Sequence, residues 1–274
     1  MSKGNMRRHL ALFDLHGPHN IDLTPVLAFA KDYAPTDFII GGDFLNHEWC
    51  SHWNEHEFKY IGLEKISKMF DEEMAFGRNL LAQIIEALPT DCNKYFIPGN
   101  HEDWLYWACL TYPAIAGGLR LGVENLTYKS DLANIRKVVL ANLITKFLET
   151  GRFNIKVLPL DKELTLGKIT YLHGHNINSM TALKKRYPAR NIVIGHHHTH
   201  LVETLHNSGD SKRANQYVFA PCLCKLSPGF LKDSSTRWLQ GIWTADVLPG
   251  SGHFDGRVVK VIDGCIMYGG KIYK

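Results

Sequence analysis

The chain has 274 residues, of which 45% are hydrophobic and 21% are charged, and its formal net charge is +4. This composition is typical of a globular protein and excludes extended disorder. The sequence contains no run of about 18 apolar residues, which is the length needed to span a membrane. Residues 1–8 lack the apolar stretch of a signal peptide, and the cysteines lack a disulfide-like spacing, so we expect a cytoplasmic protein with reduced thiols.

The first part of the chain predicts short buried strands that alternate with helices. Apolar runs at 10–13 and 38–40 flank a helix at about 24–33, in which Thr24 is a candidate cap and Pro25 suits the first turn. This βαβ arrangement predicts two parallel, neighbouring strands. Apolar residues then recur at helical spacing over 55–88, which predicts one long helix or two helices joined near Gly77.

The rest of the chain predicts a strand at 94–97, a helical insertion and further strands. The insertion, at about 103–161, is expected to cover one side of a site and to include a helix at 131–150. Its early aromatic residues Trp104, Tyr106 and Trp107 are expected to pack in the core. Strands are expected at 169–172 and 192–194, and Asp263-Gly264 between β-rich runs predicts a hairpin.

A polar cluster follows each of five predicted strands. In an open α/β sheet, side chains beyond the carboxyl ends of strands converge in space. Carboxylates, imidazoles and one carboxamide together suit two borderline divalent metals, so the clusters predict a metal site. The clusters are Asp14-Leu15-His16, Gly42-Asp43, Gly99-Asn100-His101-Glu102, His173-Gly174-His175 and Gly195-His196-His197-His198.

The order and spacing of these clusters resemble the calcineurin-like metallophosphoesterase superfamily. More narrowly, they are similar to its small, often phage-encoded members related to DNA-repair exonucleases. The resemblance covers residues 14–198 and implies an α/β fold, a four-layer sandwich in which two mixed central sheets are flanked by helices. We expect residues 1–274 to form a single domain of this kind, with the helical insertion at about 103–161.

The resemblance implies two divalent metal ions and a role for each cluster. One ion is expected on Asp14, His16 and His198, and the second on Asn100, His173 and His196, with Asp43 bridging both. Imidazole ligands favour manganese, with iron, zinc or nickel as alternatives. His101 follows Asn100 on the same turn and is expected to stabilise the transition state or protonate the leaving oxygen without binding metal. The expected catalytic residues are therefore His101, Asp43 and Asn100.

These residues predict a phosphoesterase that hydrolyses a phosphate ester through a metal-activated hydroxide. A DNA nuclease is one interpretation, although the weakly positive charge favours nucleic acid only slightly. A phosphatase or phosphodiesterase acting on nucleotides or other small molecules is the alternative. A non-catalytic scaffold that binds nucleic acid or a protein partner is a competing class, and a single-zinc hydrolase would need only three protein ligands. No membrane partner is expected, and the oligomeric state stays open.

Two departures from the family pattern affect the site. Asn46 stands where many relatives carry a second acidic residue, which predicts a missing charge beside the metals. The histidine run at 196–200 permits a second register with His198 and His200 as ligands. We favour His196 and His198 because Gly195 directly follows the strand, and His197 and His200 are then expected to face away or to support the ligands.

Several other polar residues have a structural interpretation beside a functional one. Glu102 suits a helix N-terminus. His175 and Asn176 could contact phosphate or make structural hydrogen bonds. Cys222 and Cys224 are expected to pack as small residues rather than bind zinc. His47, Cys50, His52 and His56 are expected in a surface loop rather than in a second zinc site, with His47 and His52 alternatively along the cleft. The basic residues at 184–190 are expected on a solvated helix face rather than in a phosphate clamp.

Overall fold

The computed structural model describes residues 5–51, 63–111, 132–207, 210–226 and 236–274. Its helices are α1 (Thr24–Tyr33), α3 (Leu63–Glu86), α4 (Asn100–Thr111), α6 (Leu132–Phe147) and α7 (Met180–Arg186), with short 3₁₀ turns η1 (Glu48–Cys50) and η3 (Thr150–Phe153). Its strands are β1 (Arg7–Leu12), β2 (Asp37–Ile40), β3 (Asn93–Phe96), β4 (Ile155–Val157), β5 (Leu164–Leu166), β6 (Ile169–Leu172), β7 (Asn191–Ile194), β8 (Leu201–Asn207), β9 (Asp210–Phe219), β10 (Gly241–Val247), β11 (Phe254–Ile262), β12 (Cys265–Tyr268) and β13 (Lys271–Tyr273).

The larger sheet carries the first three predicted strands at its centre. Its strand order is β13-β12-β11-β10-β1-β2-β3-β4. Strands β1 to β4 run parallel to one another, whereas β10 pairs antiparallel with β1. The βαβ prediction is confirmed, because β1 and β2 are parallel neighbours joined through α1. These four strands therefore end at the same edge of the sheet.

The smaller sheet has the order β5-β6-β7-β9-β8. Its strands β6, β7 and β9 are parallel, while β5 and β8 pair antiparallel at the two edges. The strands predicted at 169–172 and 192–194 are β6 and β7, so two further polar clusters follow adjacent parallel strands.

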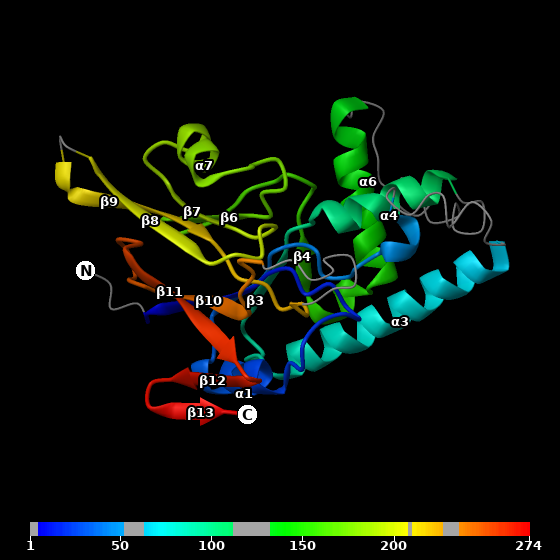
Figure 1. The fold of residues 1–274 in the computed structure, drawn as a ribbon, viewed down its shortest axis with the longest axis horizontal. Coiled ribbons are helices and arrows are strands. Elements are labelled where there is room, and N and C mark those ends of the chain that lie inside the picture. Colours follow the sequence, from blue (N-terminus) through cyan, green and yellow to red (C-terminus); the bar gives the residue numbers. More distant parts are fainter. Residues whose placement is uncertain (1–4, 52–62, 112–131, 208–209, 227–235) are drawn as a thin grey trace.

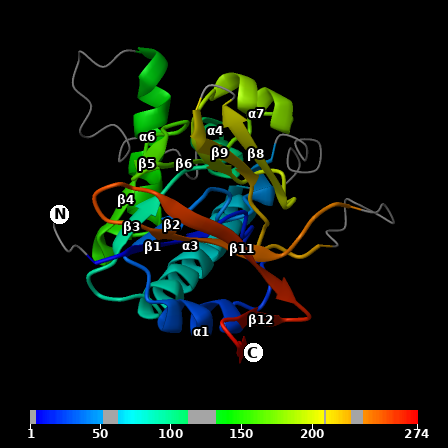
Figure 2. The same ribbon diagram turned by 90° about the vertical axis from the view of Figure 1, so that its left-hand side faces the viewer.

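Alternating side chains along β1 show how the two sheets stack. Leu10 and Leu12 belong to the core beneath α1 and α3, whereas Ala11 and Phe13 belong to the core between the sheets. The outer face of the smaller sheet packs against α7 through residues such as Leu183. The layers are thus helices, sheet, sheet and helix, which confirms the predicted sandwich (Figures 1 and 2).

The start of α1 differs from the prediction. Thr24 is the first residue of the helix, and Leu23 occupies the cap position without a side-chain hydrogen bond. The amide and hydroxyl of Thr24 both donate to Asp22 Oδ1, at 2.9 and 2.7 Å. Asp22 therefore accepts the first amide of the helix, and Thr24 does not act as the cap.

The long helix α3 runs through Gly77 without a break, so the alternative of two helices joined there is wrong for residues 63–86. A Cβ atom at Gly77 would lie 2.8 Å from both Leu45 Cδ1 and Leu148 Cδ2. Gly77 thus permits close packing rather than marking a helix end. The first part of the predicted helix, 55–62, lies outside the described residues.

The expected insertion contains α4 and α6, and it ends in a strand. The helix predicted at 131–150 ends at Phe147, and Ile155–Val157 forms β4, which extends the larger sheet beside β3. The core expectation for the aromatic residues is wrong for Trp107, whose side chain is 48% exposed. The C-terminal hairpin is confirmed, because Asp263 and Gly264 take φ angles of 49° and 68° between β11 and β12.

Candidate metal centre

The polar clusters meet where the parallel strands of both sheets end. In the larger sheet, β1 leads to Asp14 and His16, β2 leads to Asp43, and β3 leads to Asn100 at the start of α4. In the smaller sheet, β6 leads to His173 and β7 leads to the histidine run. The convergence follows from parallel pairing, which places the carboxyl ends of neighbouring strands at one edge.

Asp14, His16 and His198 form the first group of candidate ligands. One ligand atom from each lies within 4.8 Å of the others. His16 Nε2 lies 3.1 Å from His198 Nε2, which in turn lies 3.7 Å from Asp14 Oδ1. Burial lowers the pKa of His16 well below its usual value and that of His198 to about 3. Both rings are therefore neutral near pH 7, which is the form that binds metal.

Asp43, His173 and His196 form the second group, which Asn100 joins. His173 Nδ1 donates to the Gly41 carbonyl at 3.0 Å, so in the neutral ring the lone pair is on Nε2. That atom lies 3.0 Å from Asn100 Oδ1 and 3.2 Å from Asp43 Oδ2. Three acceptors thus face one another without a donor.

A positive charge must stabilise this arrangement of acceptors. One solution is a proton on His173: although burial opposes its charged form, Asp43 and Asp14 raise the pKa of His173 to about 10. The other is a divalent cation, for which carboxylate, amide oxygen and imidazole are suitable ligands. The donor set therefore fits a metal ion.

Asp43 reaches both groups. Its Oδ2 lies 3.2 Å from His173 Nε2 and 3.9 Å from His16 Nε2. Although burial alone would raise the pKa of Asp43, the nearby His173 ring holds it well below its usual value. Burial instead raises the pKa of Asp14. Asp43 is consequently the carboxylate that lies next to both groups of candidate ligands.

His101 lies at the rim of the two groups in a fixed orientation. Its Nδ1 donates to the Asn46 carbonyl at 2.5 Å, and its ring packs on Trp104 with a centroid separation of 3.9 Å. Its Nε2 faces Asp43 Oδ2 at 3.9 Å. The nitrogen that faces the site is therefore Nε2, which is not used in holding the ring.

Asn46 contributes its backbone rather than its side chain. The carbonyl orients His101, while the side-chain amide donates to Glu48 Oε2 at 3.2 Å on the protein surface. The family pattern concerns only the side chain at this position, whereas the contact with the site is made by the backbone carbonyl.

Tight backbone geometry holds the candidate ligands. Gly42 has a φ angle of +97°, and a Cβ atom there would lie 2.4 Å from His173 Nδ1. A Cβ atom at Gly99 would lie 2.2 Å from Asp43 Oδ1. Positive φ angles, which cost free energy in residues other than glycine, occur at five candidate ligands. They are Asp14, His16, Asp43, His196 and His198.

Glu102 has a larger role than the helix-terminus interpretation gave it. Its carboxylate accepts the Gly99 amide at 2.7 Å, which is the expected contact at the start of α4. It also accepts the amides of Asp43 and Phe44 at 3.0 and 2.8 Å. Sequence reasoning missed this link between two clusters, because no local pattern indicates which loop a buried carboxylate will meet.

The surface-loop interpretation is wrong for His47, which is only 2% exposed. Its backbone amide and its Nδ1 contact the two oxygens of Glu73 at 2.8 and 2.7 Å, and Trp49 Nε1 donates to the same carboxylate at 2.5 Å. Burial acts to lower the pKa of His47, but the adjacent Glu73 carboxylate outweighs it, so the pKa is raised above its usual value. Among the described residues no metal-binding group includes His47 or Cys50, and His52 and His56 lie outside the description.

The histidine run takes the register that begins directly after the strand. His196 joins Asp43 and His173, and His198 joins Asp14 and His16. His197 points elsewhere, because its ring stacks on Phe219 at 4.1 Å and its Nε2 donates to the Ile177 carbonyl at 2.7 Å.

Two cysteines lie behind His198. Cys224 Sγ is 3.7 Å from His198 Nδ1. The two sulfur atoms and one ring nitrogen of His198 all lie within 4.8 Å of one another. Cys222 and Cys224 are buried, as packing predicted, but Cys224 also contacts a candidate ligand. The spacing of the cysteines alone carried no sign of His198.

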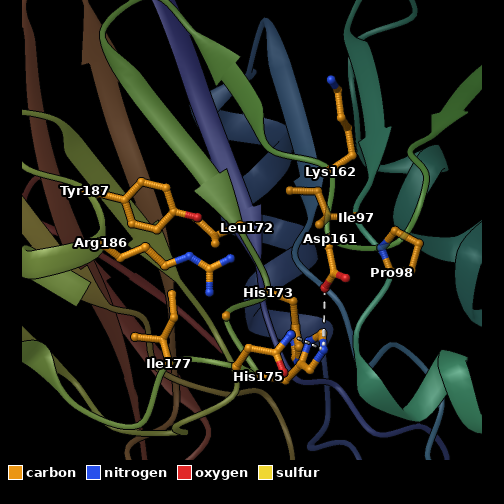
Figure 3. Close-up of a pocket in the computed structure, with 12 residues that line it drawn as sticks. Ile97, Pro98, Asp161, Lys162, Leu172, His173, His175, Ile177, Arg186 and Tyr187 are labelled. Carbon is orange, nitrogen blue, oxygen red and sulfur yellow. Dashed lines mark hydrogen bonds and ion pairs between the residues drawn. The ribbon is translucent and has the colours of Figure 1, made fainter. Parts of the chain in front are cut away.

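The basic residues at 184–190 are partly paired. Lys184 Nζ lies 2.5 Å from Glu203 Oε2, and Arg190 lies 2.8 Å from Glu163 Oε2. Beside the metal groups, His175 Nε2 lies 3.5 Å from Asp161 Oδ1 and accepts from Asn176 Nδ2 at 2.9 Å (Figure 3). His175 and Asn176 thus make the structural contacts that were one of their two interpretations.

Comparison with known proteins gives one family match. The calcineurin-like phosphoesterase family matches residues 10–227. No curated protein matches the sequence. Among solved structures, vacuolar protein sorting 29 from Cryptosporidium parvum is similar at 11% identity and a TM-score of 0.46, over 96% of this chain and 95% of that one. Across the described part of the chain, no helix has the length and apolar character needed to cross a membrane.

Proposed function

The chain belongs to the calcineurin-like phosphoesterase family, and from this premise we propose that its metal centre is dinuclear and hydrolyses a phosphate ester. Metal-dependent hydrolysis of phosphate esters is the activity of the family. The finer assignment concerns which residues hold the metals and which group moves a proton.

One observation carries the proposal: His173 Nε2 lies 3.0 Å from Asn100 Oδ1 and 3.2 Å from Asp43 Oδ2, and when the His173 ring is neutral all three atoms are acceptors that need a cation among them. With His196 they offer a complete second ligand set beside that of Asp14, His16 and His198. Neutral imidazoles mixed with oxygen ligands favour manganese over magnesium. The cations would supply Lewis acidity, which neutralises phosphate charge and acidifies water.

His101 is the proposed proton donor to the leaving oxygen. Its Nδ1 proton is used by the Asn46 carbonyl, so the transfer requires a second proton on Nε2, the nitrogen that faces the site. As a water oxygen bonds to phosphorus and the bond to the leaving oxygen breaks, this proton passes to the leaving oxygen, and the neutral ring stays held by Asn46 and Trp104.

The test compares chelator-treated and manganese-loaded protein with bis(p-nitrophenyl) phosphate as substrate. We expect hydrolysis only after loading, and two manganese ions per chain. Asp43→Asn should abolish turnover, whereas Asp32→Asn, on a carboxylate that pairs with Lys271 on the surface, should not. Full activity in the metal-free protein would sink the proposal, and a single bound ion would contradict the dinuclear centre.

For the substrate we propose a phosphodiester, with DNA as the first candidate. A net charge of +4 supports approach to a polyanion but does not by itself select one. A panel of single-stranded DNA, duplex DNA, cyclic nucleotides and phosphopeptides, assayed with manganese, separates the nuclease from the alternatives. Turnover of phosphopeptides without cleavage of DNA would exclude the nuclease.

A further inference from the structure

A hollow opens beside the metal centre, between the loop after β6 and the segments after β3 and β4. It is a depression partly open to solvent rather than an enclosed cavity, so a bound group would lie against its lining residues. His173 lies at one end, so a group bound here would be next to the reacting phosphate. Figure 3 shows this neighbourhood.

Apolar side chains form one wall of the hollow, and a single guanidinium points into it. The wall includes Ile97, Leu172 and Ile177. In Figure 3 the Arg186 side chain extends past Leu172 and Ile177 toward the side where His173 lies, whereas the Lys162 side chain points away. The hollow therefore combines apolar surface with one directed positive charge.

Arg186 differs from Lys184 and Arg190 in how it is paired. Lys184 and Arg190 each contact a carboxylate, of Glu203 and Glu163 respectively. Within the described ranges no carboxylate pairs with Arg186, whose guanidinium lies 5.7 Å from the centre of the Tyr187 ring. A cation that is not used by the fold is available to a ligand.

The one carboxylate in the hollow is already balanced. Asp161 Oδ2 lies 3.3 Å from Lys137 Nζ, and Asp161 Oδ1 faces His175. The charge of Arg186 is therefore not cancelled from across the hollow, and the site is suited to an anion.

We propose that this hollow binds the nucleotide next to the scissile bond, with Arg186 on the phosphate adjacent to the one that is hydrolysed. This inference rests on the proposed function and specifies its substrate class as an oligonucleotide. A guanidinium matches two phosphate oxygens at once, and an apolar wall accepts a sugar or a base. A substrate with a single phosphate would leave Arg186 unused.

The kinetic test uses manganese-loaded protein and substrates that differ by one phosphate. Dithymidine with one internal phosphodiester is compared with the same dinucleotide phosphorylated at its 5′ or its 3′ end, and with bis(p-nitrophenyl) phosphate. Arg186→Gln should lower kcat/KM for a phosphorylated dinucleotide about tenfold or more, mainly through KM, and should leave the two single-phosphate substrates unchanged. Lys185→Gln, the same charge change one residue away, should affect none of them.

A binding measurement separates this inference from the proposed function. Calorimetric titration of the phosphorylated dinucleotide into chelator-treated protein needs no turnover, and Arg186→Gln should again weaken binding about tenfold or more. Equal binding by both proteins, or no binding by either, would overturn the subsite. So would an equal loss of activity on every substrate, which indicates a structural role for Arg186. Failure of the wild-type protein to hydrolyse any substrate, with the binding difference intact, would reject the catalytic proposal alone.

A nucleoside triphosphate also carries a second phosphate beside the one that is hydrolysed, but it is a small molecule rather than an oligonucleotide. It is included as a separate arm, with release of phosphate as the readout. Preference for the phosphorylated dinucleotide supports the oligonucleotide assignment. Arg186-dependent preference for the triphosphate would overturn it in favour of a small nucleotide.

Discussion

The carboxylate of Glu102 accepts the backbone amide of Asp43 at 3.0 Å. This bond joins the start of α4 to the loop after β2. It holds the backbone of Asp43, whose side chain lies between the two ligand groups. Because Glu102 is only 2% exposed, water cannot replace it.

Replacing Glu102 by Gln should weaken both the fold and the centre. The side-chain amide has one acceptor oxygen in place of two, so a buried backbone amide loses its partner. We expect the free energy of unfolding to fall by about 1–3 kcal/mol and manganese affinity to drop with it. Urea denaturation and calorimetric titration check this. Glu72→Gln, on an exposed position of α3, is the control, and equal behaviour of the two variants would count against the role of Glu102.

Gly99→Ala should disable metal binding with little effect on secondary structure. The added Cβ atom would lie 2.2 Å from Asp43 Oδ1, so the carboxylate must move. A displacement of about 1 Å costs about 100-fold in activity, and we expect a loss of that order. Gly151→Ala is the matched control, because nothing lies within 4 Å of its added atom. Wild-type activity in Gly99→Ala would show that the loop adapts freely.

His101→Gln should lower kcat without lowering metal affinity. The expected decrease is about 10²- to 10⁴-fold for an alkyl leaving group, which needs a proton as it departs. It should be much smaller for p-nitrophenolate, which leaves without one. His197→Gln, at a ring that stacks on Phe219, should leave both rates close to wild type. The same decrease for both leaving groups would rule out proton donation.

Cys224→Ala should weaken metal binding through His198. If Nε2 of His198 is the ligand atom, its Nδ1 keeps a proton, and Cys224 Sγ at 3.7 Å is the acceptor. Loss of such a partner typically costs about 10- to 100-fold in affinity. Cys224→Ser keeps an acceptor and should lose less. Cys92→Ala, at a buried thiol just before β3 and thus far from the carboxyl ends of the strands, is the control in manganese titrations.

Stability should fall in mild acid because of His9. Burial lowers the pKa of His9 to about 4, whereas the unfolded chain takes up the proton at about pH 6.5. The unfolded state therefore binds more protons between these values, and the free energy of unfolding should decrease as pH falls from about 6.5 to 4, by up to about 3 kcal/mol.

His9→Gln removes this titration and should flatten the pH dependence. Urea denaturation of chelator-treated wild type and variant at pH 7.5, 6 and 5 gives the comparison, in which the histidines of the metal centre contribute equally to both. Parallel pH profiles would contradict the assignment to His9.

The first buried strands and the polar clusters after them were predictable because they depend on short-range patterns, whereas the four-layer architecture followed from the resemblance to a family. Buried strands at 10–13, 38–40 and 192–194 are apolar runs bounded by polar residues, and β1, β2 and β7 match them within three residues at each end. Parallel pairing then brings the clusters together by a general rule of α/β sheets. The helix positions were equally readable, apart from the start of α1, where Asp22 accepts the Thr24 amide and Thr24 does not act as the cap.

Contacts between segments remote in sequence were not predictable. The sequence predicts a loop position for His47, but its ring contacts Glu73 of α3. It predicts a packing role for Cys224, whose sulfur also lies 3.7 Å from His198 Nδ1. Trp107 looked like a core residue and is half exposed. In each case the environment is set by which segment packs nearby, and local composition does not contain that information.

By itself the sequence determined where the first buried strands lie along the chain, the set of carboxylate, amide and imidazole groups that follow them, and the reaction class that such a set supports. Only the tertiary structure decided how those groups are held: which nitrogen of His101 faces the centre, which amides Glu102 binds, and which cation beside the centre is free for a substrate. The physical reason is that periodicity and ligand chemistry are local properties of a chain. Hydrogen-bond partners, burial and pKa shifts arise only when distant segments exclude water from one another.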